Sequence, residues 1–274
     1  MRAKRLAPYL FVLPSLLGLL AFFYVPFLWS ARFLFLGQDG GALASFQRTL
    51  QNEMFLSGSG NTMLFCLCCV PPLLLLSTGL ATGLRYAQRS ARGFLGLLFL
   101  PYVLPVSAVV AFFSYLFDYR GPVNRLLATL GGARVQWLDS GAIVLVVVLL
   151  YLWRNTGFAL VFLSARLSVL PKELLEAAQL DGAGYWRCCR HLLLPYLLPA
   201  LTFVGVMAFV QAQDVFREVY LLSGSYPPPQ AYTLQHFLFN RFHAGDFASV
   251  TAAAYLFTPV VFLCGAIFAR GTKT

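Results

Sequence analysis

Charged residues are scarce in this sequence, and their scarcity excludes an ordinary soluble domain. Of 274 residues only 11% are charged and 59% are hydrophobic, whereas a soluble domain carries about 25% charged residues. The mean hydropathy is +0.73. A bilayer core of ~30 Å, which is crossed by helices of ~20 apolar residues, explains this composition. Because the apolar stretches are continuous rather than alternating, the sequence predicts membrane-spanning helices and not a β-barrel.

Several motifs of catalytic and binding proteins are missing as well. There is no GxxxxGK[ST] sequence, so the chain is not expected to hydrolyse ATP by itself. No grouping of histidine and cysteine has the spacing of zinc ligands. Cys66, Cys68 and Cys69 lie inside an apolar run, where cysteine behaves as a small hydrophobic residue. We therefore expect no catalytic residue, no metal site and no cofactor bound by this chain.

What the sequence does contain is a series of long apolar runs. They are Tyr9–Ala31, Asn61–Leu84, Phe94–Phe117, Gly141–Ala165, Tyr196–Leu222 and Phe247–Phe268. The first is longer than the ~7–15-residue core of a signal peptide and is interpreted as an uncleaved helix. Prolines in or near the runs are candidates for kinks, which membrane helices tolerate. The prediction is an all-α polytopic membrane protein with six transmembrane helices.

The positive charges indicate an orientation. The net charge of +10 is spread over short segments between the apolar runs, which argues against nucleic-acid binding. With a cytoplasmic N-terminus, twelve cations fall inside: Arg2, Lys4, Arg5, Arg85, Arg89, Arg92, Arg166, Lys172, Arg187, Arg190, Arg270 and Lys273. Seven fall outside: Arg32, Arg48, Arg120, Arg125, Arg134, Arg217 and Arg241. Since Lys and Arg concentrate on the cytoplasmic side, both termini are predicted to be cytoplasmic.

The segment 166–195, before the fifth run, is too long for a simple turn. Pro171 is suited to begin a short helix, and Asp181-Gly182 ends it because glycine adopts left-handed geometry without steric cost. A second helix is predicted over Tyr185–Leu194. Such a helical hairpin has the form of a docking element for a cytoplasmic partner. The alternative is an amphipathic hairpin that lies on the lipid headgroups.

This segment also carries a specific motif. Glu176-Ala177-Ala178 is followed by Asp181-Gly182-Ala183, and Pro195 lies thirteen positions after Gly182. The pattern resembles the EAA motif of bacterial ABC-importer permeases. Further stretches at 61–62, 101–124, 153–158 and 167–183 resemble the carbohydrate-uptake branch of that family, so the resemblance covers nearly the whole chain.

The resemblance implies a type I ABC importer permease fold. The chain would be one permease domain over 1–274, with its core at about 60–268 and a coupling loop at 166–195. Residues expected to couple to an ATPase are Glu176, Ala177, Ala178, Asp181, Gly182 and Pro195. Implied partners are two ATP-binding subunits that use ATP and Mg, a second homologous permease or a second copy of this one, and an extracellular or periplasmic binding protein. The implied location is the bacterial inner membrane, in contact with lipid.

The implied cargo is a sugar or a related polyol or sugar phosphate, but two departures from the family pattern weaken any closer assignment. The turn after the fifth helix reads Ser223-Gly224-Ser225-Tyr226-Pro227-Pro228-Pro229 in place of a Thr-Gly-Gly-Pro-like turn. Arg217 stands where an aspartate is common near the end of that helix.

Polar residues inside the predicted helices are candidates for the translocation path, because a charge at mid-bilayer costs at least ~2.5–3.5 kcal/mol unless it faces water or protein. The candidates are Arg154, Asn155, Gln211, Gln213, Asp214, Arg217 and Glu218. The last three lie at i, i+3 and i+4 and so share a helix face. The alternative for these three is a ring of charges at the outer interface. Arg154 is expected to pair with a neighbouring subunit.

Two rival functions remain. A secondary transporter or a channel would need no ATPase, and the EAA-like loop argues against it. A membrane-embedded enzyme would need clustered His, Asp or Glu in the helices, but His191, His236 and His243 all fall in predicted loops.

The predicted orientation can be tested by cysteine labelling of intact cells on a cysteine-free background. A membrane-impermeant reagent added outside should modify a cysteine that replaces Ser225 but not one that replaces Ser90. The reverse pattern would overturn the orientation.

Overall fold

The structure is a computed structural model that describes residues 3–36, 41–87 and 92–270, with side chains over 11–35, 41–87 and 93–266. Every helix or strand assigned in these ranges is a helix, so the all-α prediction is confirmed. Arg2, Arg89, Ser90 and Lys273, which entered the orientation prediction, lie outside the described residues.

The helices follow one another along the chain, with three short irregular ones among them. They are α1 (Ala3–Leu19), η1 (Leu20–Tyr24), α2 (Val25–Ser30), α3 (Phe33–Leu36), α4 (Gly41–Leu50), α5 (Glu53–Tyr86), α6 (Arg92–Val103), α7 (Val106–Leu116), α8 (Pro122–Thr129), α9 (Ile143–Ser168), α10 (Lys172–Leu180), α11 (Tyr185–Cys188), η2 (Cys189–Leu193), α12 (Leu194–Gln213), α13 (Phe216–Ser223), η3 (Pro229–Ala231), α14 (Leu234–His243) and α15 (Phe247–Arg270).

Five stretches of the described chain are long and apolar enough to cross a membrane. They are Phe11–Phe35, Glu53–Tyr86, Ile143–Ser168, Tyr185–Ser223 and Phe247–Ala266. A further span consists of two pieces, Gly93–Val103 and Val106–Leu116, which meet at 95°. The predicted six spans are confirmed when this bent pair counts as one.

The bend between α6 and α7 lies at Leu104-Pro105. Proline has no N–H to donate, and it restricts the residue before it to extended conformations, so a helix does not continue through this dipeptide. Pro71 and Pro72, in contrast, lie inside the continuous helix α5. The prediction of a proline kink is therefore confirmed at Pro105, while α5 passes its two prolines as one helix.

Two predicted helix boundaries are wrong. The second span begins at Glu53 rather than Asn61, because the Oδ1 of Asn52 accepts hydrogen bonds from the N–H groups of Met54 and Phe55 and caps the helix there. The fifth span begins at Tyr185, since α11 continues through the π-helical turn η2 into α12. The second helix of the predicted hairpin is thus the start of a membrane span.

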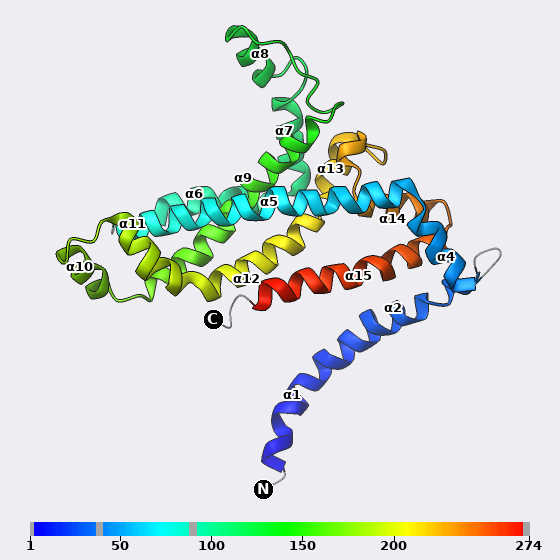
Figure 1. Ribbon diagram of the computed structural model, residues 1–274, viewed down its shortest axis with the longest axis horizontal. Helices are drawn as coiled ribbons and strands as arrows, with labels where there is room; N and C mark the ends of the chain where they lie inside the picture. The colour runs from blue at the N-terminus through cyan, green and yellow to red at the C-terminus, as the bar shows by residue number, and fades with distance from the viewer. Residues whose placement is uncertain (1–2, 37–40, 88–91, 271–274) are drawn as a thin grey trace.

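The centre of the bundle is formed by α5, α9 and α12, which lie together in Figure 1. Their facing side chains belong to one buried apolar cluster that includes Leu73, Val147, Leu160 and Val204. The first span diverges from this bundle (Figure 1). It touches α15 where the rings of Phe27 and Tyr255 stack with centroids 4.5 Å apart.

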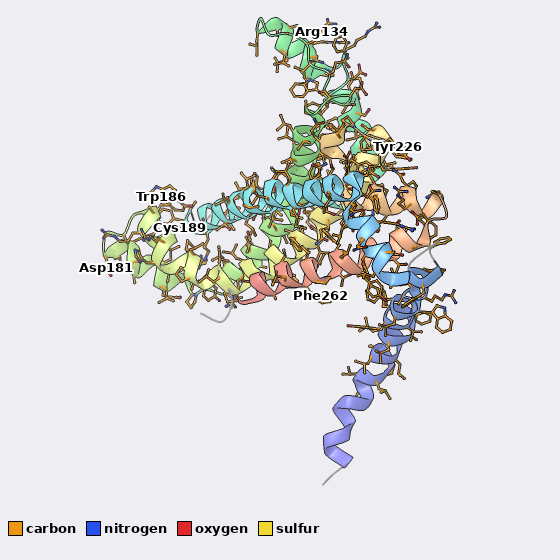
Figure 2. The ribbon with its side chains drawn as sticks, turned by 45° about the vertical axis from the view of Figure 1, so that its right-hand side comes forward. Arg134, Asp181, Trp186, Cys189, Tyr226 and Phe262 are labelled. Carbon is orange, nitrogen blue, oxygen red and sulfur yellow. The ribbon has the colours of Figure 1, made fainter. Side chains whose placement is uncertain are left out.

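The bundle has two distinct ends. One carries α10 and α11 and is called the hairpin end; the other carries α4 and α14 and is called the α14 end (Figure 1). Figure 2 shows Asp181 and Trp186 at the hairpin end and Tyr226 far from them, toward the α14 end.

A single glycine sets the distance between α6 and α9. Gly157 of α9 is buried, and a Cβ at this position would overlap the backbone carbonyl of Leu98 and lie 2.8 Å from the Cα of Phe99. Because these neighbours are backbone atoms, they cannot give way by a change of rotamer. The close approach of α6 to α9 therefore requires glycine here.

We expect Gly157→Ala to destabilise the protein by ~1–3 kcal/mol, the usual cost of inserting a methyl group into a packed interior. The matched control is Gly79→Ala in α5, where an added Cβ would have no neighbour within 4 Å. Unfolding in detergent micelles measures both. Equal stability of the two variants would contradict the packing described for α6 and α9.

Candidate functional site

The first candidate site is the hairpin of α10 and α11. Pro171 occupies the position before α10, and Leu175 is the fully buried residue of this helix. Glu176 and Ala177 are exposed, and Ala178 is half-buried. The carboxylate predicted to meet a partner thus points away from the core.

The turn of the hairpin is a Schellman motif. The N–H of Ala183 donates to the carbonyl of Ala178 (2.9 Å), and that of Gly182 donates to the carbonyl of Gln179 (3.0 Å). Gly182 has φ +77°, which confirms that glycine is needed for left-handed geometry. Asp181, beside it, is exposed at the C-cap.

Two large apolar side chains on the hairpin have no cover within the described chain. Leu180 is 89% exposed and Trp186 is 81% exposed, and Figure 2 shows Trp186 on the outside of the hairpin end. Exposed apolar residues of this size mark surfaces that contact a partner or lipid. Pro195 lies apart from this turn, in the first turn of α12.

The second candidate site is a polar cavity of ≈ 150 Å³ between α6, α9, α12 and α13. It is lined by Tyr102, Tyr151, Arg154, Asn155, Gln211, Asp214, Arg217 and Glu218. Six of the seven residues predicted for the translocation path therefore meet around one space. Gln213, the seventh, is not among the lining residues.

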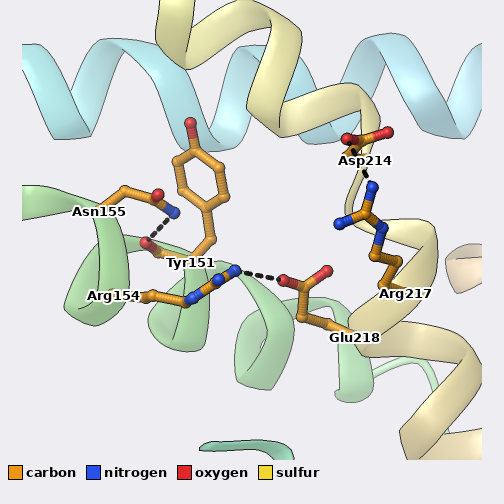
Figure 3. A network of polar contacts seen from close by, with 6 residues as sticks. All are labelled: Tyr151, Arg154, Asn155, Asp214, Arg217 and Glu218. Atoms are coloured by element: carbon orange, nitrogen blue, oxygen red, sulfur yellow. Dashed lines mark hydrogen bonds and ion pairs between the residues drawn. The ribbon is translucent and has the colours of Figure 1, made fainter. Parts of the chain in front are cut away.

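Two ion pairs occupy the cavity, and Figure 3 shows both. An Nη of Arg154 lies 3.2 Å from an Oε of Glu218, with side chains 22% and 12% exposed. An Nη of Arg217 lies 3.4 Å from an Oδ of Asp214, and both of these side chains are largely exposed. Arg154 has a partner in its own chain, because the turn of α13 brings Glu218 within reach, and its expected pairing with a neighbouring subunit stays a prediction.

A break in the fifth span makes this pairing possible. α12 ends at Gln213 and α13 begins at Phe216, so Asp214 and Val215 interrupt the helix. The second carboxylate oxygen of Asp214 accepts a hydrogen bond from Gln235 of α14 (3.2 Å). The predicted common face of Asp214, Arg217 and Glu218 is retained only in part, since Glu218 turns to α9.

Tyrosine rings and amides complete the lining. The ring of Tyr102 stacks on Phe158 with centroids 5.0 Å apart. Tyr151 donates its hydroxyl to the carbonyl of Ala208 (2.7 Å), and the amide of Asn155 donates to the carbonyl of Tyr151 (2.9 Å). The cavity thus combines aromatic faces, amides and paired charges.

The two tyrosines of the cavity were not predicted from the sequence. Tyr102 lies in the broken third span and Tyr151 one turn before Arg154, but thirteen tyrosines occur in the chain and none is marked by a motif. Among the residues described, no group of three or more His, Cys, Asp or Glu side chains is placed to hold a metal ion.

Comparison with known proteins identifies relatives over most of the chain. Residues 74–271 match the family described as binding-protein-dependent transport system inner membrane component. The sn-glycerol-3-phosphate transport system permease protein UgpA of Yersinia pestis is 32% identical over 255 residues, which cover 90% of this chain and 86% of that protein. The xylose/arabinose import permease protein XacH of Haloferax volcanii is 28% identical over 216 residues, or 77% and 68% of the two chains.

Solved structures share the fold. A bacterial ABC transporter involved in the import of the acidic polysaccharide alginate superposes with a TM-score of 0.80 at 21% identity, covering 98% of each chain. The same score is found for the bacterial alginate ABC transporter in complex with an alginate pentasaccharide-bound periplasmic protein, at 23% identity and 99% and 97% coverage.

The ion pair of Arg154 and Glu218 yields a stability prediction. Removing one member of a buried pair costs ~3–5 kcal/mol, and we expect Glu218→Ala to cost about 3 kcal/mol because the Arg154 side chain retains 22% exposure. Removing both charges, in Arg154→Met with Glu218→Leu, should cost less than Glu218→Ala alone.

Denaturation of the purified protein in detergent measures these differences. The control is Arg217→Ala, which breaks the exposed pair and should cost less than ~1 kcal/mol. A Glu218→Ala variant as stable as this control would show that the inner pair carries no buried charge.

Proposed function

This chain belongs to the family of binding-protein-dependent transport system inner membrane components, and we propose that it carries a sugar, a polyol or a sugar phosphate through its polar cavity. Members of the family are the non-catalytic, membrane-spanning subunits of ABC importers in the inner membrane. The observation that carries the proposed path is the convergence of six predicted polar residues on one cavity.

The lining of the cavity supports a hydroxylated cargo. Arg154, Asn155 and Gln211 supply donors, Asp214 and Glu218 supply acceptors, and hydroxyl groups of a sugar can use both kinds. The ring of Tyr102 offers a flat apolar face of the sort that packs against a sugar ring. The names of the relatives agree with this chemistry, since they include permeases for glycerol 3-phosphate and for xylose and arabinose.

The hairpin is proposed as the element that couples transport to ATP hydrolysis. It projects past the end of α5 along the bundle (Figure 1), with Glu176, Leu180 and Trp186 exposed on it. Glu176, Ala177, Ala178, Asp181 and Gly182 would then meet a cleft of an ATP-binding subunit, and Pro195 would begin the membrane span behind it.

The remaining partners follow from the same proposal. Two ATP-binding subunits that use ATP and Mg lie beneath the membrane, and a binding protein delivers the cargo from outside. The alginate transporter structure supports this partner, since it is a complex with an alginate pentasaccharide-bound periplasmic protein. A second permease or a second copy of this chain completes the path. The first span supports this pairing, because its apolar stretch is left outside the core of this chain.

The proposed orientation places the hairpin end and both termini in the cytoplasm. The cations Arg166, Lys172, Arg187 and Arg190 at or near the hairpin agree with the enrichment of Lys and Arg on that side. The α14 end then faces the binding protein. The rival function, transport without an ATPase, leaves the exposed hairpin without a role.

We expect Glu176→Lys to uncouple the importer. Placing a positive charge in a site shaped for a carboxylate, and leaving its partner unpaired, costs ~2–5 kcal/mol at an interface, or a roughly 30- to several-thousand-fold loss of affinity. Because Glu176 is exposed, folding itself should change by less than ~0.5 kcal/mol. Binding-protein-stimulated ATP hydrolysis and uptake in reconstituted vesicles measure the effect.

The matched control is Glu173→Lys, which makes the same charge change at another exposed position of α10. It should retain most of the stimulated hydrolysis. Wild-type hydrolysis and uptake in Glu176→Lys, at equal amounts of permease, would refute docking through the hairpin.

A further inference from the structure

At the hairpin end, α5 makes hydrogen bonds to a residue just before α10 and to the first residue of α11. The hydroxyl of Tyr185, the first residue of α11, lies 2.9 Å from the Oγ1 of Thr82. The guanidinium of Arg85 donates to the carbonyl of Leu170, just before α10 (2.7 Å). The rings of Tyr86 and Tyr185 also pack edge to face with centroids 5.3 Å apart. A displacement of the hairpin therefore acts directly on the end of α5.

At the α14 end, three residues on one face of α5 hold the segment 229–234. The amide of Asn61 donates to the carbonyls of Pro229 (2.7 Å) and Tyr232 (2.9 Å). The Oγ1 of Thr62 accepts from the N–H of Leu234 (3.0 Å). The backbone of Thr233 packs closely on Gly58: a Cβ added to Gly58 would lie 3.0 Å from the carbonyl carbon and oxygen of Thr233.

The segment held by α5 leads directly to the polar cavity. Gln235 follows Leu234 and donates to the carboxylate of Asp214 (3.2 Å). His236 belongs to a capping box at the start of α14, in which its Nδ1 accepts a hydrogen bond from the N–H of Thr233 (3.2 Å). Burial lowers the pKa of His236 to about 4, so the imidazole is neutral and able to accept at physiological pH. Hydrogen bonds thus connect the end of α5, through the segment 229–235, to Asp214 at the mouth of the cavity.

Between these ends α5 is a single helix of 34 residues, or about 50 Å at 1.5 Å per residue. Its buried core positions run from Phe65 to Ala81, on both sides of Pro71 and Pro72, and pack against α9 and α12. Because this packing holds α5 on both sides of the two prolines, where a helix would otherwise bend most easily, we treat α5 as one unit. Thr62 and Thr82 are twenty residues apart, which corresponds to ~30 Å.

We propose that α5 transmits the movement of the hairpin to the outer mouth of the cavity, with Thr82 and Tyr185 as positioning residues at one end and Asn61 and Thr62 at the other. This inference rests on the proposed docking of the hairpin to an ATP-binding subunit. Through this link, ATP binding on one side of the membrane changes the positions of Asp214 and Gln235 near the other side. It also lets the binding protein, seated at the α14 end, stimulate hydrolysis.

The test is a double-mutant cycle on the assembled importer in vesicles. Tyr185→Phe removes only the hydroxyl that meets Thr82. Thr62→Val removes the acceptor of Leu234, together with the hydrogen bond that Thr62 donates to the carbonyl of Gly58 within α5. Each should keep the ATP-binding subunits bound and basal hydrolysis unchanged, while the stimulation by binding protein falls roughly threefold to tenfold, the range for one lost hydrogen bond. The double variant should be within about twofold of the more affected single variant, since one break already interrupts the link.

Matched controls exist on the same helix. Tyr86→Phe removes a neighbouring hydroxyl for which no hydrogen bond is found among the described residues, and Thr78→Val does the same for a threonine. Both should keep wild-type stimulation. Asn61→Asp, which puts an acceptor beside two carbonyls, is a second variant of the outer end and should behave like Thr62→Val.

Two results would overturn the link. One is an effect of the double variant equal to the product of the single effects, because independent sites this far apart combine in that way. The other is wild-type stimulation in either single variant. Failure of the proposed function looks different: the ATP-binding subunits would not copurify with the wild-type chain, or the binding protein would not stimulate it.

Discussion

A bilayer core supplies no water to an unpaired polar group, and this constraint governs the whole molecule. It requires the backbone to be helical, and it requires the few charges in the bundle to find partners. Among the acidic residues that the structure describes, Glu218 is the buried one, and it lies 3.2 Å from Arg154 of another helix. The pair therefore links α13 to α9, and both of its members line the cavity.

The same constraint explains where the helices break. Irregular backbone at membrane depth is tolerated where it is buried in protein or lines a water-filled space. The break at Leu104-Pro105 follows Tyr102, and the break at Asp214-Val215 includes an ion-pair residue, so both adjoin the cavity. Gly157 allows α6, the helix before the first break, to pack close to α9.

The sequence predicted the features that depend on composition and on local chemistry. Six spans follow from apolar runs, the turn at Gly182 follows from the freedom of glycine, and family membership follows from the EAA-like motif; these predictions are confirmed. Contacts between distant residues could not be read in this way. Arg154 and Glu218 are 64 positions apart, and Thr82 and Tyr185 are 103 apart, so only packing brings them together. The prediction began the second span at Asn61, because the residues before it are partly polar. The cap that Asn52 provides starts the helix at Glu53 in spite of these polar residues.

The balance of charge in the cavity bears on the proposed cargo. Both arginines already face a carboxylate of the same chain, so the lining as a whole adds no net charge. A phosphate group would have to compete with Glu218 for Arg154 and would be repelled by that carboxylate and by Asp214. Hydroxyl groups, in contrast, can donate to the carboxylates and accept from the guanidinium groups without separating either pair. Within the proposed function, the cavity of this chain therefore suits an uncharged sugar or polyol, and a sugar phosphate would need further cations from the second permease.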